Sequence, residues 1–302
     1  MITSQIRKIR ELFRDYGIYK GLKIWFYYKN VRLKKRGLNL KNKIVYVNDY
    51  KLELLPNDDG ISTELALFKT HEPLNTELLK DNLKEGMICL DVGANIGYYT
   101  LLESKIVGDK GMVIAIEPSP INFSILKKNV EMANAKNVNL FCLAGGDENG
   151  VLKFLLDKQS NLSRILGEDE IVKPSDKIVD VPVKKLDVFI EELNLKKFDF
   201  LRMDVEGYEY QIYKGFRNSL KKFKPMIQME FHYMLLGNKK TRELLGMLKE
   251  DGYDLVYYIV REFDRPTVMN KKDVKKISLN QVIDLLDEGK ISPAFLTLLR
   301  PL

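Results

Sequence analysis

Acidic side chains follow two apolar runs of this chain at the points where each run breaks into a turn. Asp91 lies near the end of residues 87–92, just before Gly93 and Gly97, and Glu117 follows residues 112–116. In an open α/β sheet, ligands bind at the carboxyl ends of the strands, and a carboxylate there can accept hydrogen bonds from both hydroxyls of a ribose. The pattern therefore predicts a site for a nucleoside-type ligand.

The glycine spacing narrows the choice of nucleoside. Dinucleotide enzymes use G-x-G-x-x-G, so that a pyrophosphate can lie at the amino end of a helix. Here the turn between Asp91 and Thr100 holds only Gly93 and Gly97. This favours a ligand without pyrophosphate over a nicotinamide cofactor, and S-adenosylmethionine is such a ligand.

Two later apolar runs end in further candidates for chemistry. Asp204 and Glu206 close residues 198–205, and Glu230 and His232 close residues 225–231. If the strands continue, two-residue alternation points each pair to one side, and the four groups would cluster beside the cofactor sulfur. Such a cluster could be a general base for a hydroxyl acceptor or could bind a divalent cation. We favour the base and expect no metal, although a lone histidine such as His232 is more often structural.

Alternating strand and helix patterns must position these residues, and they predict an α/β fold with parallel strands. Strands are expected at 87–92, 112–116, 138–143, 198–205, 225–231, 255–260 and 295–299, and helices at 76–84, 97–107, 121–133, 186–193, 210–220, 239–251 and 279–288. A hairpin at 43–55 leads into this domain, which spans 43–302. A polar segment at about 157–177 is expected to be an insertion that could serve as a lid.

Residues 1–42 form a separate basic extension. Residues 1–43 hold 13 Lys and Arg against two acidic residues, whereas the rest of the chain holds 36 against 40. Aromatic and aliphatic residues recur at helical spacing over 1–37, with breaks at Gly17 and Gly21, which indicates one or two amphipathic helices. Three interpretations stay open: a helix packed on the domain, an arm that binds an anionic membrane surface, or an arm that binds RNA.

The sequence shows neither a membrane span nor a secretory signal, and this bears on the cellular compartment. No run approaches the length of a membrane span, and Lys and Arg interrupt every apolar segment near the amino terminus, so we expect a cytoplasmic protein, with peripheral contact to the inner face of a membrane as an option for residues 1–37. Cys89 and Cys142 lie in apolar runs without metal-ligand spacing. We expect buried thiols rather than a disulfide or a zinc site.

Taken together, the motifs resemble those of the FkbM-family methyltransferases. They are LDVGANIGYYT at 90–100, IEPSP at 116–120 with LKKN at 126–129, KLD at 185–187 and MDVEG at 203–207. They lie in order between about His71 and Phe231. The resemblance implies a class I S-adenosylmethionine-dependent methyltransferase: a three-layer, Rossmann-like α/β sandwich with a mostly parallel seven-stranded sheet. It also implies methyl transfer to a hydroxyl of a sugar or a related natural product.

The resemblance also implies roles for individual residues. Cofactor contacts are expected from Asp91, Gly93 and Gly97 to the methionine part, from Glu117 to the ribose, and from Asp147 or its neighbours to the adenine edge. Asn95 and Asp204 are also expected to bind the cofactor. The chain departs from the family where Arg202 replaces a common Lys and His71 a common Arg, and His71 is a candidate for the acceptor pocket. Tyr98, Tyr99 and Tyr208 could face the sulfonium with their rings, although packing explains them as well.

Two other functions fit parts of the sequence. An RNA-directed methyltransferase could use the basic arm, but the chain has no Pro-Pro pair of the kind found in enzymes that methylate base amino groups. A membrane-associated scaffold that binds cofactor without turnover is disfavoured by the acids at the strand ends. We therefore expect a small-molecule, glycan or glycolipid acceptor and no nucleic acid, while the sequence is silent on oligomeric state.

Overall fold

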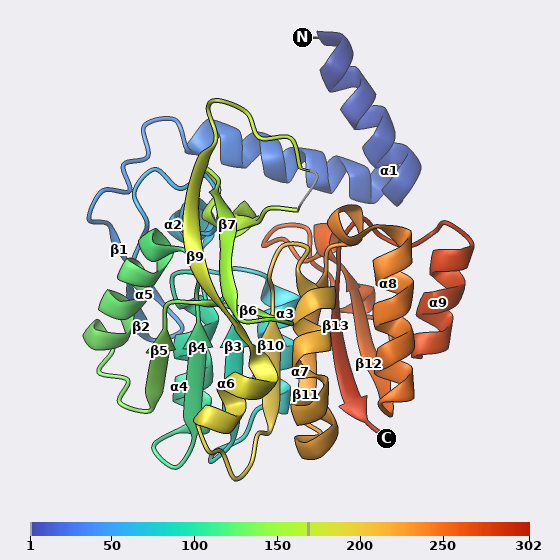
Figure 1. Ribbon diagram of the computed structural model, residues 1–302. Coiled ribbons are helices and arrows are strands. Elements are labelled where there is room, and N and C mark those ends of the chain that lie inside the picture. The colour runs from blue at the N-terminus through green and yellow to red at the C-terminus, as the bar shows by residue number, and fades with distance from the viewer. Residues whose placement is uncertain (1, 168–169) are drawn as a thin grey trace.

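A seven-stranded sheet forms the centre of the computed structural model, which describes residues 2–167 and 170–302 (Figure 1). Its strand order is β12-β13-β11-β10-β3-β4-β5. The strands are β3 (Ile88–Val92), β4 (Met112–Ile116), β5 (Val138–Phe141), β10 (Phe200–Met203), β11 (Met226–Phe231), β12 (Tyr253–Val260) and β13 (Phe295–Pro301). Strand β13 is antiparallel to both of its neighbours, and the pairings among β5, β4, β3, β10 and β11 are parallel.

Helices cover both faces of this sheet because the strand side chains alternate. Leu90 and Val92 face the layer of α6 (Leu186–Glu192), α7 (Glu209–Phe223), α8 (Tyr233–Glu250) and α9 (Leu279–Asp287). Cys89 and Val113 face the layer of α3 (Pro73–Asn82), α4 (Tyr98–Val107) and α5 (Pro120–Met132). Strands buried on both faces read as continuous apolar runs, as these do. The predicted three-layer sandwich with a mostly parallel sheet is confirmed.

The segment before the sheet differs in part from expectation. The lead-in hairpin is present as β1 (Ile44–Val47) and β2 (Tyr50–Glu53), and Asn48 and Asp49 turn with φ of 50° and 67°. Helix α2 (Ile61–Phe68) was not predicted. Helix α3 begins at Pro73, not at Thr76, because Pro73 occupies its first turn and Glu72 is the N-cap, while the Asn75 side chain donates to Glu72.

A smaller sheet stands above the carboxyl ends of the central strands. It has the order β6-β9-β7-β8, from β6 (Ala144–Gly146), β7 (Gly150–Leu156), β8 (Arg164–Ile165) and β9 (Lys177–Lys185). The predicted insertion at about 157–177 contains β8 and the short helix η1 (Ser160–Leu162); its residues 168 and 169 lie outside the described part of the chain. Figure 1 shows β7 and β9 rising from the sheet toward the amino-terminal helix.

The predicted basic extension is α1 (Ile2–Lys34), which Gly17 breaks into two parts with φ of 73°. The second part crosses the body, where Ile24 and Tyr27 pack with Val268, and the first part projects away from it (Figure 1). In the part of the chain that the structure describes, no helix is long and apolar enough to cross a bilayer. Two further short helices, η2 (Arg261–Phe263) and η3 (Lys271–Asp273), lie between β12 and α9.

Candidate active site

A cavity with about 780 Å³ of empty space, part of it open to solvent, lies at the carboxyl ends of β3, β4 and β10. Apolar side chains make up much of its lining, among them Val92, Ile116, Phe154, Val205 and Ile212. A few polar groups converge on it, including Asn95, Glu117, Asp204 and Glu206. This size and mixture of groups are typical of sites for small ligands and cofactors.

The glycine turn forms one wall of the cavity. Gly93 has φ of 88°, and a Cβ atom there would overlap the backbone oxygen of Asp204. The amides of Gly93 and Ala94 both donate to the carbonyl of Ile116 at 3.0 Å, which ties the turn to the end of β4. Glycine is therefore required at 93 both for its backbone conformation and for the close approach of β10.

Glu117 lines the cavity from the end of β4. Its carboxylate accepts hydrogen bonds from the amides of Asn95 at 2.8 Å and Ser119 at 2.9 Å. Burial raises the pKa of Glu117 to about 7, although these hydrogen bonds oppose the rise. Each carboxylate oxygen retains acceptor capacity for a ligand hydroxyl, since an ionised carboxylate offers about four acceptor positions.

Three predicted cofactor residues do not line the cavity. Asp91 is buried beneath it and accepts from Thr100 Oγ1 at 2.6 Å and from Arg202 Nη1 at 3.1 Å. Gly97 is the N-cap of α4, with φ of 92°. Asp147 pairs with Lys214 Nζ at 2.9 Å. Of the residues expected to hold the cofactor, the structure thus brings Gly93, Asn95, Glu117 and Asp204 together at the cavity.

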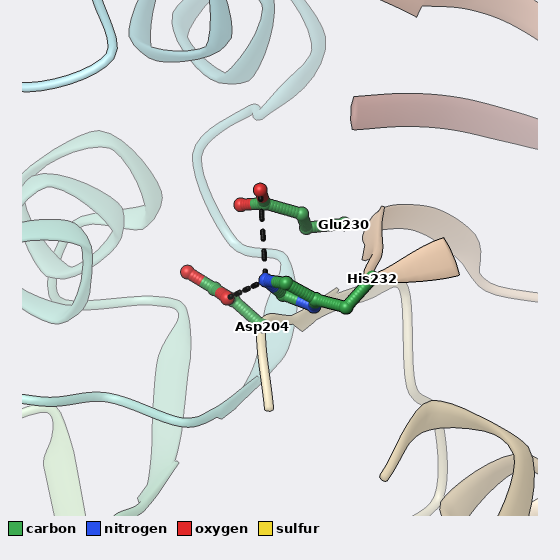
Figure 2. A group of neighbouring side chains, drawn as sticks. All are labelled: Asp204, Glu230 and His232. Atoms are coloured by element: carbon green, nitrogen blue, oxygen red, sulfur yellow. Dashed lines mark ion pairs between the residues drawn. The ribbon is translucent and has the colours of Figure 1, made fainter. Parts of the chain in front are cut away.

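Asp204 and Glu206 reach the cavity by a different route from the one expected. Strand β10 ends at Met203, and Glu206 has φ of 49°, so the predicted two-residue alternation beyond the strand is wrong. Both carboxylates nevertheless face His232, whose Nε2 lies 3.2 Å from Glu206 Oε2 and 3.9 Å from Asp204 Oδ1. Figure 2 shows Asp204, Glu230 and His232 pointing toward one another.

His232 lies behind the cavity wall and is surrounded by acids. Its Nδ1 lies 2.6 Å from Glu209 Oε1, and its Nε2 lies 3.6 Å from Glu230 Oε1. Burial disfavours a charged ring, but Glu206, Glu230 and Glu209 outweigh it and raise the pKa of His232 well above its usual value. These contacts favour the charged form of the imidazole, which disfavours His232 as the acceptor of a substrate proton. Burial also raises the pKa of Glu206, against the effect of His232.

One arrangement in this cluster has the spacing of a cation site. Asp204, Glu230 and His232 each offer a ligand atom, and these atoms lie within 4.8 Å of one another. The Arg261 guanidinium, whose Nε lies 3.0 Å from Glu230 Oε1, already pairs with one of these acids. A metal ion would bind only the unprotonated ring of His232, whereas the surrounding acids favour its protonated form.

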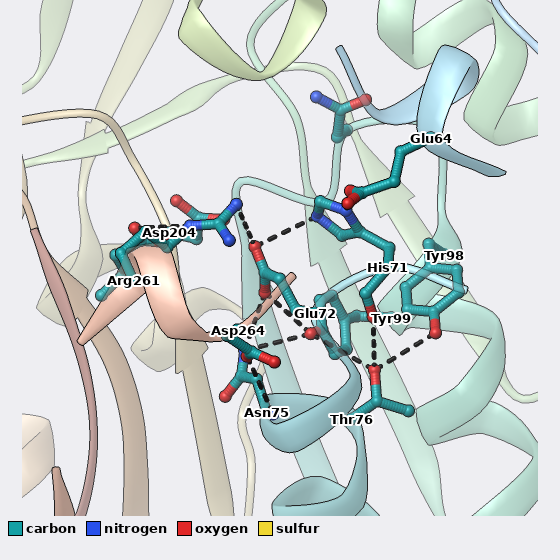
Figure 3. Close-up of polar contacts among 12 residues, drawn as sticks. Glu64, His71, Glu72, Asn75, Thr76, Tyr98, Tyr99, Asp204, Arg261 and Asp264 are labelled. Carbon is teal, nitrogen blue, oxygen red and sulfur yellow. Dashed lines mark hydrogen bonds and ion pairs between the residues drawn. The ribbon is translucent and has the colours of Figure 1, made fainter. Parts of the chain in front are cut away.

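A second network of buried ion pairs surrounds His71 on the other side of the cavity (Figure 3). His71 lines the cavity and is buried between Glu64, on its Nδ1, and Glu72, whose Oε1 lies 3.1 Å from its Nε2. Arg261 Nη2 lies 2.7 Å from the same oxygen of Glu72. Burial opposes the charge on His71, but Glu72 and Glu64 raise its pKa to about 10. His71 therefore lines the cavity, as predicted, and its raised pKa favours the charged form of its ring.

Arg202 adds a further cation to the lining of the cavity. Its guanidinium contacts Asp91 and, at 3.1 Å, Asp204 Oδ2, and it stacks 3.9 Å above the ring of Tyr99. Tyr98, Tyr99 and Tyr208 all line the cavity, as one of the two interpretations of these rings required. Four charged residues of the site were not predicted from the sequence: Glu64, Glu72, Glu209 and Arg261. Of these four, only Glu209 lies next to a motif that the sequence analysis used, because it follows Gly207 by two residues.

These lining residues fit S-adenosylmethionine. Glu117 offers acceptors for ribose hydroxyls, the apolar walls offer a slot for adenine, and the carboxylates of Asp204 and Glu206 offer negative charge to a sulfonium. The turn at Gly93 and Asn95 would hold the amino acid part. The cavity therefore has the groups that this cofactor needs.

Comparison with known proteins identifies a methyltransferase domain in this part of the chain. The family model described as "Methyltransferase FkbM domain" matches residues 91–255. "Methyltransferase 1" of Beauveria bassiana is 29% identical over 142 residues, which cover 42% of this chain and 57% of that protein. A "Protein-L-isoaspartate O-methyltransferase" of Thermotoga maritima is 38% identical over 60 residues, or 20% of this chain and 19% of that protein. The chain thus spans less than two thirds of these two relatives.

Longer but more distant similarities also occur. A "Probable cobalt-precorrin-6B C(15)-methyltransferase (decarboxylating)" of Sulfolobus acidocaldarius is 27% identical over 194 residues, which cover 62% of this chain and 97% of that protein. The crystal structure of "Methyltransferase FkbM" from Methylobacillus flagellatus matches with a TM-score of 0.46 and 15% identity, over 78% of this chain and 51% of that one.

Proposed function

The chain belongs to the FkbM methyltransferase family, and from this membership we propose that it methylates a hydroxyl group of a sugar, glycan, glycolipid or related small molecule. It has the class I methyltransferase fold and uses S-adenosylmethionine. This cofactor, when bound, supplies the methyl group on a positively charged sulfur. The chain's own residues must hold the acceptor in line with that methyl group, exclude water and remove the acceptor proton.

The observation that carries this proposal is the presence of Asp204 and Glu206 in the same cavity as Gly93 and Glu117. A sugar hydroxyl is a weak nucleophile, and a carboxylate within hydrogen-bond reach can take its proton as the methyl group is transferred. Glu206 suits this task because burial raises its pKa, so its carboxylate holds a proton more firmly than an exposed one.

His232 and its neighbours then have a supporting role. The imidazole lies against both Glu206 and Asp204, so it orients these carboxylates, and it favours the ionised form of Glu206. Glu230 does not line the cavity, and burial raises its pKa to about 8 while Arg261 opposes the rise. We therefore assign proton removal to Glu206 or Asp204 and positioning to His232 and Glu230.

The acceptor end of the cavity is polar, which suits a sugar. His71, Arg202 and the tyrosines of α4 line it beside Asp204, and Ser160, Asn161 and Ser163 of the insertion line it from above. Hydroxyl and amide groups of this kind recognise sugar hydroxyls by hydrogen bonds. Both cysteines are free thiols, which fits the cytoplasmic location that we propose.

Mass spectrometry of isolated acceptors tests the proposal. Glycans and glycolipids from cells that lack the chain are incubated with the purified protein and S-adenosylmethionine, and products that gain one methyl group are identified. We expect a base-stable methyl ether, and we expect Glu206→Gln to bind cofactor but to form this product far more slowly. A methyl group on nitrogen, carbon or a carboxylate would overturn the proposed acceptor chemistry, because each of these products is distinct from an ether.

A further inference from the structure

The amino-terminal helix α1 has two apolar faces, and the body covers only one of them. Ile24 and Tyr27 are buried against Val268, and Tyr27 donates a 2.6 Å hydrogen bond to Glu64 on α2. On the opposite side, exposed apolar residues recur at helical spacing: Ile18, Tyr19, Leu22, Phe26 and Leu33. Ile18 and Tyr19 are 70% and 71% exposed. A helix that has already packed one stripe and still presents another is suited to a second apolar partner.

Positive charge surrounds this exposed stripe. Residues 16–36 contain seven Lys and Arg and no acidic residue. Lys20 pairs with Asp273, and Lys35 pairs with Asp59 at 3.0 Å, so these two are held by the body. Within the described part of the chain, the other five have no carboxylate partner: Lys23, Lys29, Arg32, Lys34 and Arg36. The surface therefore offers both apolar area and unneutralised positive charge.

Aromatic rings and cations also alternate along the helix. Lys23 Nζ lies 4.9 Å from the ring of Tyr19, and Lys29 Nζ lies 4.8 Å from the ring of Trp25. Tyr, Trp and Lys together favour the boundary between lipid headgroups and acyl chains, where the ring has an apolar body and the cation meets anionic headgroups.

We infer that the exposed face of α1, defined by Ile18, Tyr19, Leu22, Phe26 and Leu33 with the basic residues around them, docks on an anionic lipid bilayer. The apolar stripe would enter the headgroup boundary while Lys29 and Arg32 contact acidic lipids. A second copy of this chain fits less well, because it would bring two basic surfaces together, and like charges across an interface cost free energy.

Docking through α1 would bring the bilayer close to the cavity. The helix crosses the molecule at the edge of the sheet that carries the cavity (Figure 1), and Tyr27 is connected through Glu64 to the cavity residue His71. A bilayer bound to α1 would therefore lie at the cavity edge of the molecule. Docking itself does not depend on the proposed methyl transfer.

Sedimentation of the full chain with lipid vesicles tests the inference. The probes are vesicles of phosphatidylcholine alone and vesicles with about 30 mol% phosphatidylglycerol. We expect the chain to sediment with the anionic vesicles and to remain in solution with the neutral ones. The triple variant Ile18→Ser, Leu22→Ser, Phe26→Ser should lower the partition coefficient at least about tenfold, because three apolar side chains no longer leave water.

Matched variants separate lipid docking by this face from a general effect of changing surface residues. Ile44 and Tyr46 on β1 and Ile121 on α5 are exposed to a similar degree outside α1, and their replacement by Ser should leave sedimentation unchanged. Lys29→Glu with Arg32→Glu should abolish it, whereas Lys239→Glu with Lys240→Glu on α8 should not. Cofactor binding by each variant confirms that it is folded.

Three results would overturn the inference. The chain could fail to sediment with either vesicle. It could sediment equally well after loss of the apolar stripe, which would reduce the contact to charge alone. It could instead bind single-stranded RNA with an affinity that falls on charge reversal but not on loss of the stripe, which would assign the face to nucleic acid. Each result leaves the proposed methyl transfer untouched, because that activity is measured on isolated acceptors.

Discussion

The Nδ1 atom of His232 lies 2.6 Å from Oε1 of Glu209, whose side chain is buried. A carboxylate on one ring nitrogen fixes the orientation of the imidazole and favours its charged form. The other nitrogen then faces Glu206 at 3.2 Å. Under the proposed function, this pairing is the reason why we assign proton removal to the carboxylates at the cavity wall and not to the histidine, although the ordinary pKa of histidine suits that task.

The charge on His232 can be measured by nuclear magnetic resonance. We expect its ring to stay protonated between about pH 6 and pH 8, because three glutamates raise its pKa well above the usual value. The chain has two histidines, so His71→Gln assigns the signals. Glu209→Gln should lower the pKa of His232. A titration midpoint near the ordinary value of about 6.5 in the wild-type chain would restore His232 as the general base.

Glu206→Gln should separate catalysis from binding. We expect turnover to fall roughly a hundredfold to ten-thousandfold, the usual contribution of a general base, with little change in cofactor affinity. His232→Gln should cost less, because it removes a positioning contact and leaves the carboxylates in place. Steady-state rates with the acceptor measure turnover, and calorimetry measures cofactor affinity. An unchanged rate in Glu206→Gln would leave Asp204 as the base.

Cofactor affinity should depend on pH through Glu117. The ionised carboxylate accepts hydrogen bonds from ribose hydroxyls, and burial raises the pKa of Glu117 to about 7. Binding should therefore weaken as the pH falls from about 8 to about 6, where protonation removes acceptor capacity. Glu117→Gln should bind more weakly than the wild-type chain at about pH 8, where the carboxylate is ionised, and should lose this part of the pH dependence. Calorimetric titrations of both chains at the two pH values check it, and parallel pH profiles would contradict the assignment of Glu117 to the ribose.

Local sequence was enough to predict the glycine turn and the strands that flank it. Gly93 and Glu117 follow from short-range spacing, and the structure places both at the cavity, as predicted. The end of β10 could not be predicted in this way. Glu206 adopts its left-handed conformation in a tertiary setting where Asp204 packs against Gly93, a residue far away in sequence.

Dependence on residues far away in sequence also explains why Asp91 and Asp147 were wrongly predicted to line the cavity. Asp91 is drawn away from the cavity by Arg202, and Asp147 by Lys214, partners that are 111 and 67 residues distant. A strand-end acid looks the same in the sequence whether it meets a ligand or a buried arginine. The network of Glu64, His71 and Arg261 escaped prediction for the same reason, because each member comes from a different element.

Gly93→Ala should damage the site through the backbone. At φ of 88° a Cβ atom is strained, and it would overlap the backbone oxygen of Asp204. We expect a loss of roughly 2 kcal/mol or more of stability, together with weaker cofactor binding as the wall of the cavity shifts. Gly150→Ala is a matched control, because a Cβ there meets nothing within 4 Å. Urea unfolding compares the two variants, and equal stabilities would show that the turn tolerates a side chain.

The stability of the fold should fall in alkaline solution because of His71. Its pKa is 6.5 in a model compound and about 10 in the folded chain, where Glu72 and Glu64 overcome the effect of burial. A group whose pKa is raised by folding stabilises the fold fully below its unfolded pKa, and this contribution is lost as the pH rises toward the folded value. Between about pH 7 and pH 9 the free energy of unfolding should therefore decrease by up to about 1.4 kcal/mol per pH unit from this residue.

The comparison of His71→Gln with the wild-type chain isolates this effect from other groups. The variant should be less stable at pH 7 but should lose less stability on going to pH 9, since a neutral amide has no proton to release. Lys239→Gln, at an exposed position on α8, should keep the wild-type slope. Urea unfolding at both pH values gives the four free energies needed. If His71→Gln and the wild-type chain lose the same amount, the imidazole is neutral in the folded chain and its ion pairs with Glu64 and Glu72 contribute nothing to stability.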